Sequence, residues 1–315
     1  MGPRAATVAL VLLGLLAFCA CAAPSSPPAA ESPPHEEESA PAAQPAESLA
    51  TGERTPGQER PAPDAHTVAP QPAGDVARPQ ASSPSGKRIC LDPGHDANSP
   101  GASARDAAGR TIFNEHDLTL AVAYRLKALL ESEGFVVCVT RDAEGRPVAV
   151  PRDESGDGRL QGWERAQAKI DYVNAFGARV FVSIHFNGIS DPSVRGSEVY
   201  YPDTGPYEEN NRRLAATLLQ SLLAAMREAG YGATDRGIKS DNYKPYGRLW
   251  VLGYNDQLAR QARWQAGALV EVLFLTNPAD VSFLQRPDAL DVIARGLRDG
   301  IVRFWQETFP ADRPQ

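Results

Sequence analysis

The residues best suited to chemistry are two histidines, His95 and His185, each at the end of a short apolar run. The first run closes in the turn 92–94, and the second begins at Val180. Such runs are typical of buried strands, and in open α/β sheets ligand sites collect at the carboxyl ends of the strands. A single histidine beside a strand is usually structural, but two at equivalent strand ends favour a shared role as metal ligands.

A third ligand is expected near residue 115, where Glu115 and His116 begin a segment with helical periodicity. Catalytic zinc sites typically have three protein ligands and one open position, and two histidines with one glutamate are a common set. In a helical projection Glu115 lies at the centre of the apolar face and His116 at its edge. A carboxylate facing the core is costly, and a bound metal ion would remove that cost. The pattern favours Glu115, although an acid in the first turn also suits the helix dipole.

A second unusual acid, Glu271, interrupts the aliphatic run 268–275. In a strand covered on both faces this carboxyl group would lose its hydration, and its pKa would rise toward neutrality, as a general base for water requires. The alternative is a salt bridge with a nearby cation such as Lys239. The paired histidines favour the catalytic role.

These residues must be positioned by strands and helices that alternate along the chain after residue 86. Apolar and β-branched runs predict strands that start at Arg88 and span 135–140, 180–184, 198–201 and 268–274. Helical periodicity predicts helices over 115–133, 163–176, 208–229 and 287–305, and a polar, glycine-rich insertion covers 142–162. The pattern predicts a single α/β domain with a mostly parallel twisted sheet covered by helices on both faces.

The first 86 residues are expected to serve export and tethering. Residues 1–22 are typical of a signal peptide, because Arg4 precedes an apolar run that is too short to span a membrane comfortably. Cys21 follows a small residue and is a better candidate for a lipidated cysteine than Cys19, and ordinary cleavage near residues 20–22 is the alternative. Residues 23–86 are rich in Pro, Ala, Ser and Glu and predict a disordered linker, which leaves 87–310 as the catalytic domain.

Two further cysteines, Cys90 and Cys138, lie in strand-like runs of the folded domain. The simplest interpretation is that both are small buried core residues. An exported protein could also pair them, although two cysteines do not indicate a disulfide framework.

Four sequence blocks resemble the zinc-dependent N-acetylmuramoyl-L-alanine amidases of the type 3 family. The resemblance runs from about Lys87 to Phe304, and the blocks are Leu91-Asp-Pro-Gly-His95, Asn114-Glu-His-Asp-Leu118, Phe181-Val-Ser-Ile-His-Phe-Asn187 and Leu269-Val-Glu-Val-Leu-Phe-Leu-Thr-Asn277. It implies Zn²⁺ ligated by His95, Glu115 and His185, with Glu271 as the catalytic acid/base. It also implies hydrolysis of the amide bond between N-acetylmuramic acid and L-alanine in peptidoglycan, outside the cytoplasm, with a protein activator as a further expected partner.

Three other functions fit these residues less well. A zinc carboxypeptidase or deacetylase would act on a related wall polymer, and a peptidoglycan-binding module would have no need of a metal with an open position. A nucleotide enzyme is less favoured because no glycine-rich phosphate loop follows the first strand. The net charge of −7 also argues against a protein that holds nucleic acid by electrostatics alone.

Overall fold

The computed structural model describes residues 86–243 and 247–310 of the 315-residue chain. The predicted signal peptide, with Cys21, and nearly all of the predicted linker lie outside the described residues. Within the described part, no helix has the length and apolar character needed to cross a membrane.

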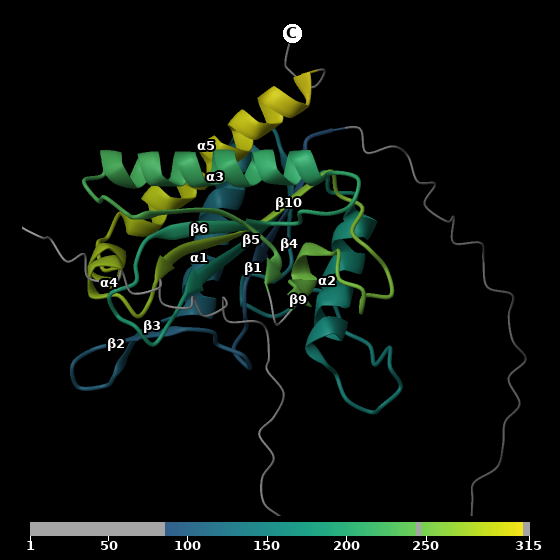
Figure 1. Ribbon diagram of the computed structural model, residues 1–315, viewed down its shortest axis with the longest axis horizontal. Helices are drawn as coiled ribbons and strands as arrows, with labels where there is room; N and C mark the ends of the chain where they lie inside the picture. Colours follow the sequence, from purple (N-terminus) through teal and green to yellow (C-terminus); the bar gives the residue numbers. More distant parts are fainter. Residues whose placement is uncertain (1–85, 244–246, 311–315) are drawn as a thin grey trace, which may run out of the picture. The chain divides into compact units, whose positions relative to one another are not determined.

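The described domain is organised around a six-stranded sheet in the order β4-β1-β5-β10-β6-β7 (Figure 1). Neighbouring strands are parallel except for β10 and β6, which are antiparallel. The predicted mostly parallel α/β sheet is therefore confirmed. The strands are β1 (Arg88–Pro93), β4 (Val136–Val139), β5 (Val180–Asn187), β6 (Ser197–Tyr201), β7 (Asp235–Ser240) and β10 (Ala266–Phe274).

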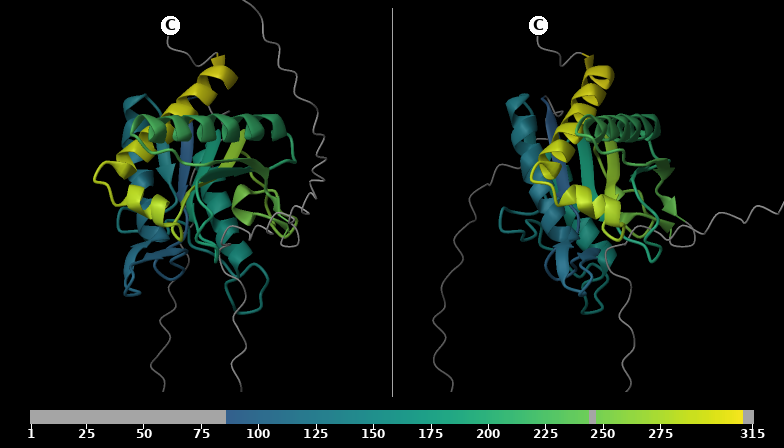
Figure 2. Two further views of the ribbon diagram at one scale, coloured as in Figure 1. Left: turned by 60° about the vertical axis from the view of Figure 1, so that its left-hand side comes forward. Right: turned by 90° about the vertical axis from the view of Figure 1, so that its left-hand side faces the viewer.

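Helices cover both faces of this sheet, as predicted. On one face α1 (Glu115–Ser132), α3 (Glu208–Glu228) and α5 (Ala289–Thr308) bury the larger apolar core, while α2 (Gly162–Phe176) and the short 3-10 helix Trp250–Leu252 cover the other. Figure 2 shows α3 and α5 crossing each other. At the crossing, Gly300 leaves no room for a side chain, because an added Cβ would lie 2.8 Å from the Cα of Leu218.

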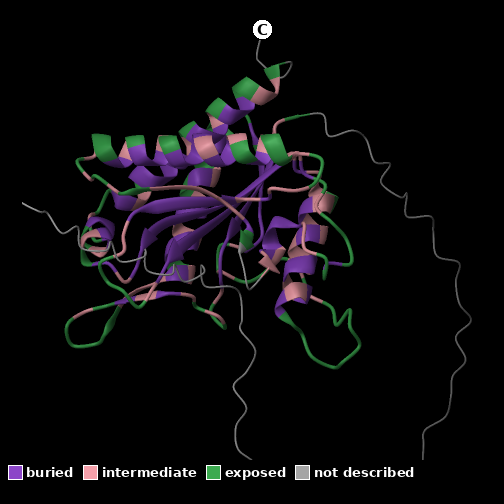
Figure 3. Cartoon of the chain, in the orientation of Figure 1, coloured by how far each residue is buried: buried purple, intermediate pink, exposed green. Residues whose placement is uncertain are grey.

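Short elements fill the connections between the main ones. A hairpin of β2 (Ser103–Arg105) and β3 (Thr111–Asn114) leads directly into α1, and a second pair is formed by β8 (Asn242–Tyr243) and β9 (Gly247–Arg248). Helix α4 (Pro278–Leu284) follows β10. The central strands are buried, whereas the loop between β4 and α2 is largely exposed (Figure 3).

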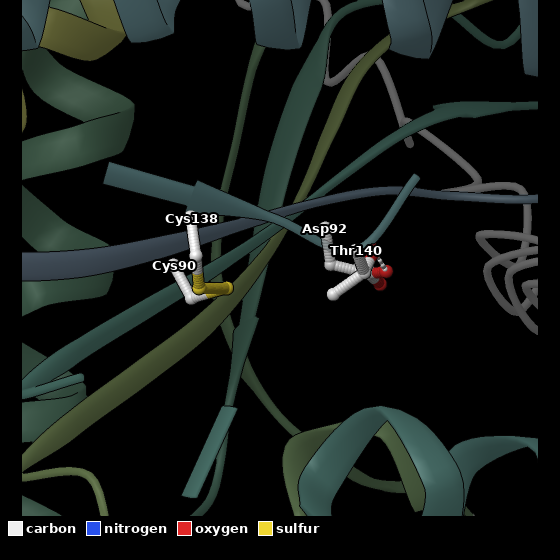
Figure 4. Close-up of a disulfide and its surroundings, with 4 residues drawn as sticks. All are labelled: Cys90, Asp92, Cys138 and Thr140. Carbon is white, nitrogen blue, oxygen red and sulfur yellow. Dashed lines mark hydrogen bonds between the residues drawn. A yellow bond between two sulfur atoms is a disulfide. The ribbon is translucent and has the colours of Figure 1, made fainter. Parts of the chain in front are cut away.

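A disulfide joins Cys90 of β1 to Cys138 of β4. The two residues are direct partners in the parallel register, and their Cα atoms are 4.6 Å apart. Both are buried in the core on the α2 side of the sheet, as the simplest interpretation predicted. The sequence did not decide whether the two cysteines pair, and the structure shows that they do. The disulfide links the edge strand β4 to β1, the strand that precedes His95 (Figure 4).

We expect the double variant Cys90→Ala, Cys138→Ala to be less stable, because the bond closes a loop of 48 residues. The loop-entropy estimate for this length is about 4 kcal/mol. Urea unfolding of the exported protein and of the variant measures the difference, and reduction of the wild type provides an independent check. An unchanged unfolding midpoint in both comparisons would contradict the expectation.

Candidate metal centre

His95, Glu115 and His185 meet at the carboxyl ends of β1 and β5. All three are buried, and one ligand-capable atom from each lies within 4.8 Å of the others. Glu115 Oε1 lies 3.1 Å from His185 Nδ1 and 3.4 Å from His95 Nε2. Two imidazoles and one carboxylate at this spacing could hold a metal ion.

Strand register explains why the two histidines meet. β1 and β5 are parallel neighbours in which Pro93 is the partner of Ile184, so the residues that follow both strands reach the same sheet edge. The backbone N–H of Gly94 donates to the carbonyl oxygen of Ile184 at 2.9 Å and continues the pairing to the site. Glu115 arrives from α1, where its own N–H is tied to the carbonyl of Ala102 at 2.9 Å.

The Glu115 carboxylate is oriented by two backbone donors. Oε2 accepts from the N–H of Ala102 at 2.8 Å, and Oε1 accepts from the N–H of Phe186 at 2.9 Å. Burial favours the neutral acid, but the hydrogen bond with His185 and the charges of His95 and His185 outweigh it. The pKa of Glu115 is therefore below its ordinary value, and the residue offers an anionic oxygen to a cation.

Two glycines leave the space that these side chains occupy. A Cβ at Gly94 would overlap the ring of His185, and one at Gly101 would overlap Glu115 Oε2. Gly101 also has a φ of 72°, a left-handed conformation that suits glycine. The side chains of His185 and Glu115 thus have room at the site only because residues 94 and 101 lack a side chain.

The choice between Glu115 and His116 is resolved by the helix geometry. Glu115 points between the two histidines, whereas Nε2 of His116 lies 3.2 Å from Oδ1 of the adjacent Asp117. His116 is not part of the three-residue group.

Glu271 lies beside this group on β10. Its direct partner in β5 is His185 and its direct partner in β6 is Glu198. It is buried, and its Oε2 has no hydrogen-bond partner among the described residues. Burial, followed by the negative charges of Glu115 and Glu198, raises the pKa of Glu271 well above its ordinary value.

The alternative interpretation of Glu271, a salt bridge with Lys239, is wrong. Lys239 Nζ contacts Oε2 of Glu198 at 2.9 Å, and Arg236 Nε contacts the same oxygen at 2.7 Å. The sequence prediction overlooked Glu198 as a member of the site. The signal that could have found it is the one that identified Glu271, an acid within an apolar strand.

Comparison with known proteins identifies the family. The family model described as N-acetylmuramoyl-L-alanine amidase, Amidase_3, matches residues 89–303. The chain belongs to this amidase family. The match confirms the resemblance inferred from the four motifs, and it favours an amidase over the carboxypeptidase, deacetylase and non-catalytic alternatives.

Individual relatives agree with the family assignment. The chain is 30% identical over 233 residues to the germination-specific N-acetylmuramoyl-L-alanine amidase of Bacillus subtilis (strain 168). This alignment covers 74% of this chain and 86% of that protein. It is 26% identical over 221 residues to the amidase LytC of the same organism, in an alignment that covers 70% of this chain and 36% of LytC.

Solved structures of other amidases share the fold. The CwlD amidase from Clostridioides difficile, in complex with the GerS lipoprotein, aligns with a TM-score of 0.53 and 22% identity, over 70% of this chain and 99% of that one. AmiC2 of Nostoc punctiforme aligns with a TM-score of 0.51 and 24% identity, over 70% of this chain and 97% of AmiC2.

The raised pKa of Glu271 predicts a pH-dependent penalty on the stability of the metal-free amidase. Because the folded-state pKa lies above the unfolded value, the folded protein binds the proton more tightly, and stability is lost as pH rises toward the folded pKa. Each unit of pKa difference is worth about 1.4 kcal/mol. Glu271→Gln should therefore raise the melting temperature of chelator-treated protein at neutral pH and above.

Thermal unfolding of the two proteins across a pH series tests this sign. The gain should shrink on acidification and vanish below about pH 4, where glutamate is protonated even in an unfolded chain. Glu228→Gln, at an exposed position of α3, is the matched control and should show no such trend. A gain that is absent at neutral pH, or equal at every pH, would contradict the assigned environment of Glu271.

Proposed function

We propose that this amidase is zinc-dependent and hydrolyses the amide bond between N-acetylmuramic acid and L-alanine in peptidoglycan. One observation carries the proposal. The buried group of His95, Glu115 and His185 lies directly beside Glu271, whose carboxyl group is also buried. A metal-binding group and a candidate general base are thus held side by side on adjacent strands.

The donor set supports zinc as the metal. Two imidazole nitrogens and one carboxylate oxygen are a common ligand set of catalytic zinc, and they leave a fourth position open. When bound, Zn²⁺ lowers the pKa of water and polarises a carbonyl group. The roles of His95, Glu115 and His185 as its ligands are part of this proposal.

Glu271 is the residue proposed to move the proton. Its Oε2 has no hydrogen-bond partner among the described residues, which leaves it available to accept a proton from the attacking water and return it to the departing amine of L-alanine. The neighbouring acid, Glu198, is instead held by Arg236 and Lys239. The two adjacent carboxyl groups are thereby given different environments, and this suits one of them to proton transfer.

The place of action belongs to the same proposal. We infer export by the segment 1–22, with Cys21 as a lipid attachment site and 23–86 as a spacer between the anchor and the domain. The disulfide supports an oxidising compartment outside the cytoplasm. A protein activator is also proposed, since the related CwlD amidase was solved in complex with a lipoprotein.

Digestion of purified peptidoglycan tests the reaction. Wild-type protein should release intact stem peptides with a free L-alanine amino terminus, and a chelator should abolish the release. Glu271→Gln should lower turnover by about 10²- to 10⁴-fold, the usual contribution of general acid–base catalysis. Fragments cut elsewhere in the stem, or wild-type activity in the variant, would contradict the proposal.

Zinc content separates the proposed ligands from the proposed base. His185→Ala should lose most of its bound zinc because a direct ligand is removed, whereas Glu271→Gln should retain it. Metal analysis of both proteins after dialysis against buffered zinc measures this difference. Equal zinc in wild type and His185→Ala would exclude His185 as a ligand.

A further inference from the structure

Arg141 lies two residues beyond the end of β4, on the side of the sheet where the metal centre lies. Its side chain is buried, with 2% of the residue exposed. A buried guanidinium usually pairs with a carboxylate. Every hydrogen bond that the structure gives to this side chain instead runs to a backbone carbonyl oxygen.

Three of these four carbonyl groups belong to the segments that carry two of the three candidate ligands, and the fourth, that of Gly145, belongs to the loop that follows Arg141. Nη1 donates to the carbonyls of Gly94 at 3.1 Å and His95 at 2.6 Å. Nη2 donates to the carbonyl of His116 at 2.9 Å, in the first turn of α1. One planar group therefore ties the loop of His95 to the helix start that presents Glu115.

The backbone at His95 needs such support. Its φ is 63°, and it is the one non-glycine residue with a positive φ in the described part of the chain. A left-handed conformation costs a non-glycine residue of the order of 1–3 kcal/mol and persists only where the surroundings enforce it. Arg141 donates to the carbonyl of His95, which follows the strained φ angle along the chain. Thr119 Oγ1 donates at 2.8 Å to the carbonyl of Gly94, which precedes it.

Arg141 is itself held in place. The N–H of Thr140 donates to the carbonyl of Leu91 at 3.1 Å, and its hydroxyl donates to Asp92. Tyr124 donates its hydroxyl to the carbonyl of Arg141 at 3.1 Å. The disulfide joins Cys90 and Cys138, two residues before Asp92 and Thr140 respectively, so it precedes these contacts along the same two neighbouring segments (Figure 4).

We propose that Arg141 is a positioning residue for the metal centre. Its guanidinium fixes the distance between the backbone of His95 and the start of α1, so that His95 and Glu115 can bind the same metal ion. The inference rests on the proposed zinc function. Lysine cannot replace this group, because a single ammonium lacks the planar fork of donors that spans several carbonyls.

The test compares Arg141→Lys with wild type in zinc affinity and in the visible spectrum of the Co²⁺-substituted protein. Loss of a residue that orients ligands typically costs about 10- to 100-fold in metal affinity. We expect a zinc dissociation constant raised by this factor, measured by competition with a chromophoric chelator, and a changed Co²⁺ spectrum. The control is Arg286→Lys, since Arg286 also donates to a backbone carbonyl, that of Ala229, but touches no ligand-bearing segment.

The outcomes are distinguishable. Zinc affinity and a Co²⁺ spectrum equal to wild type in Arg141→Lys would overturn the inference, as would an equal loss in the control. If Arg141→Lys does not fold, Arg141→Gln is measured in its place, and failure of both variants to fold also overturns it, because Arg141 would then support the whole domain. Wild-type protein that binds no zinc would instead refute the proposed function.

Discussion

The carboxylate of Glu115 is almost completely buried, and a buried charge is costly unless it is paired and hydrogen-bonded. Two backbone N–H groups and two imidazoles supply those partners. These partners come from two separate segments, the loop after β1 and the end of β5, so the arrangement exists only when both segments and the start of α1 are in place. The buried charge of Glu115 is therefore stabilised only in the folded domain, where these segments meet.

The antiparallel pairing of β6 with β10 brings a second pair of acids into register. Glu271 and Glu198 are direct partners across the two strands, which would be unfavourable if both carried an unbalanced charge. Arg236 and Lys239 pair with Glu198, and the pKa of Glu271 is raised by burial and by the acids around it. Two chemically identical side chains are thus made different by their neighbours. The functional asymmetry of the site is a property of these contacts rather than of residue type.

Most of the main elements could be predicted because their apolar periodicity is strong. Helix α1 ends one residue before the predicted boundary, and α3 ends at Glu228 rather than 229. The hairpin β2–β3 and helix α4 were not predicted, because elements of three to seven residues are too short to show a period. Strand β7 was not predicted either, since its residues are at most half-buried and carry no apolar alternation. The sequence does not predict the disulfide, because two buried cysteines in separate strands do not reveal that the strands are neighbours in register.

The sequence by itself determined the family, the alternation of strands and helices, and the four residues on which the chemistry is proposed to depend. It could do so because motif residues and hydrophobic periodicity are local properties of the chain. Only the tertiary structure decided that Lys239 neutralises Glu198 rather than Glu271 and that Arg141 joins the segments that carry His95 and Glu115. These outcomes depend on strand register and on which groups share a buried space. Both are set by contacts between residues far apart in the chain, which a one-dimensional pattern does not encode.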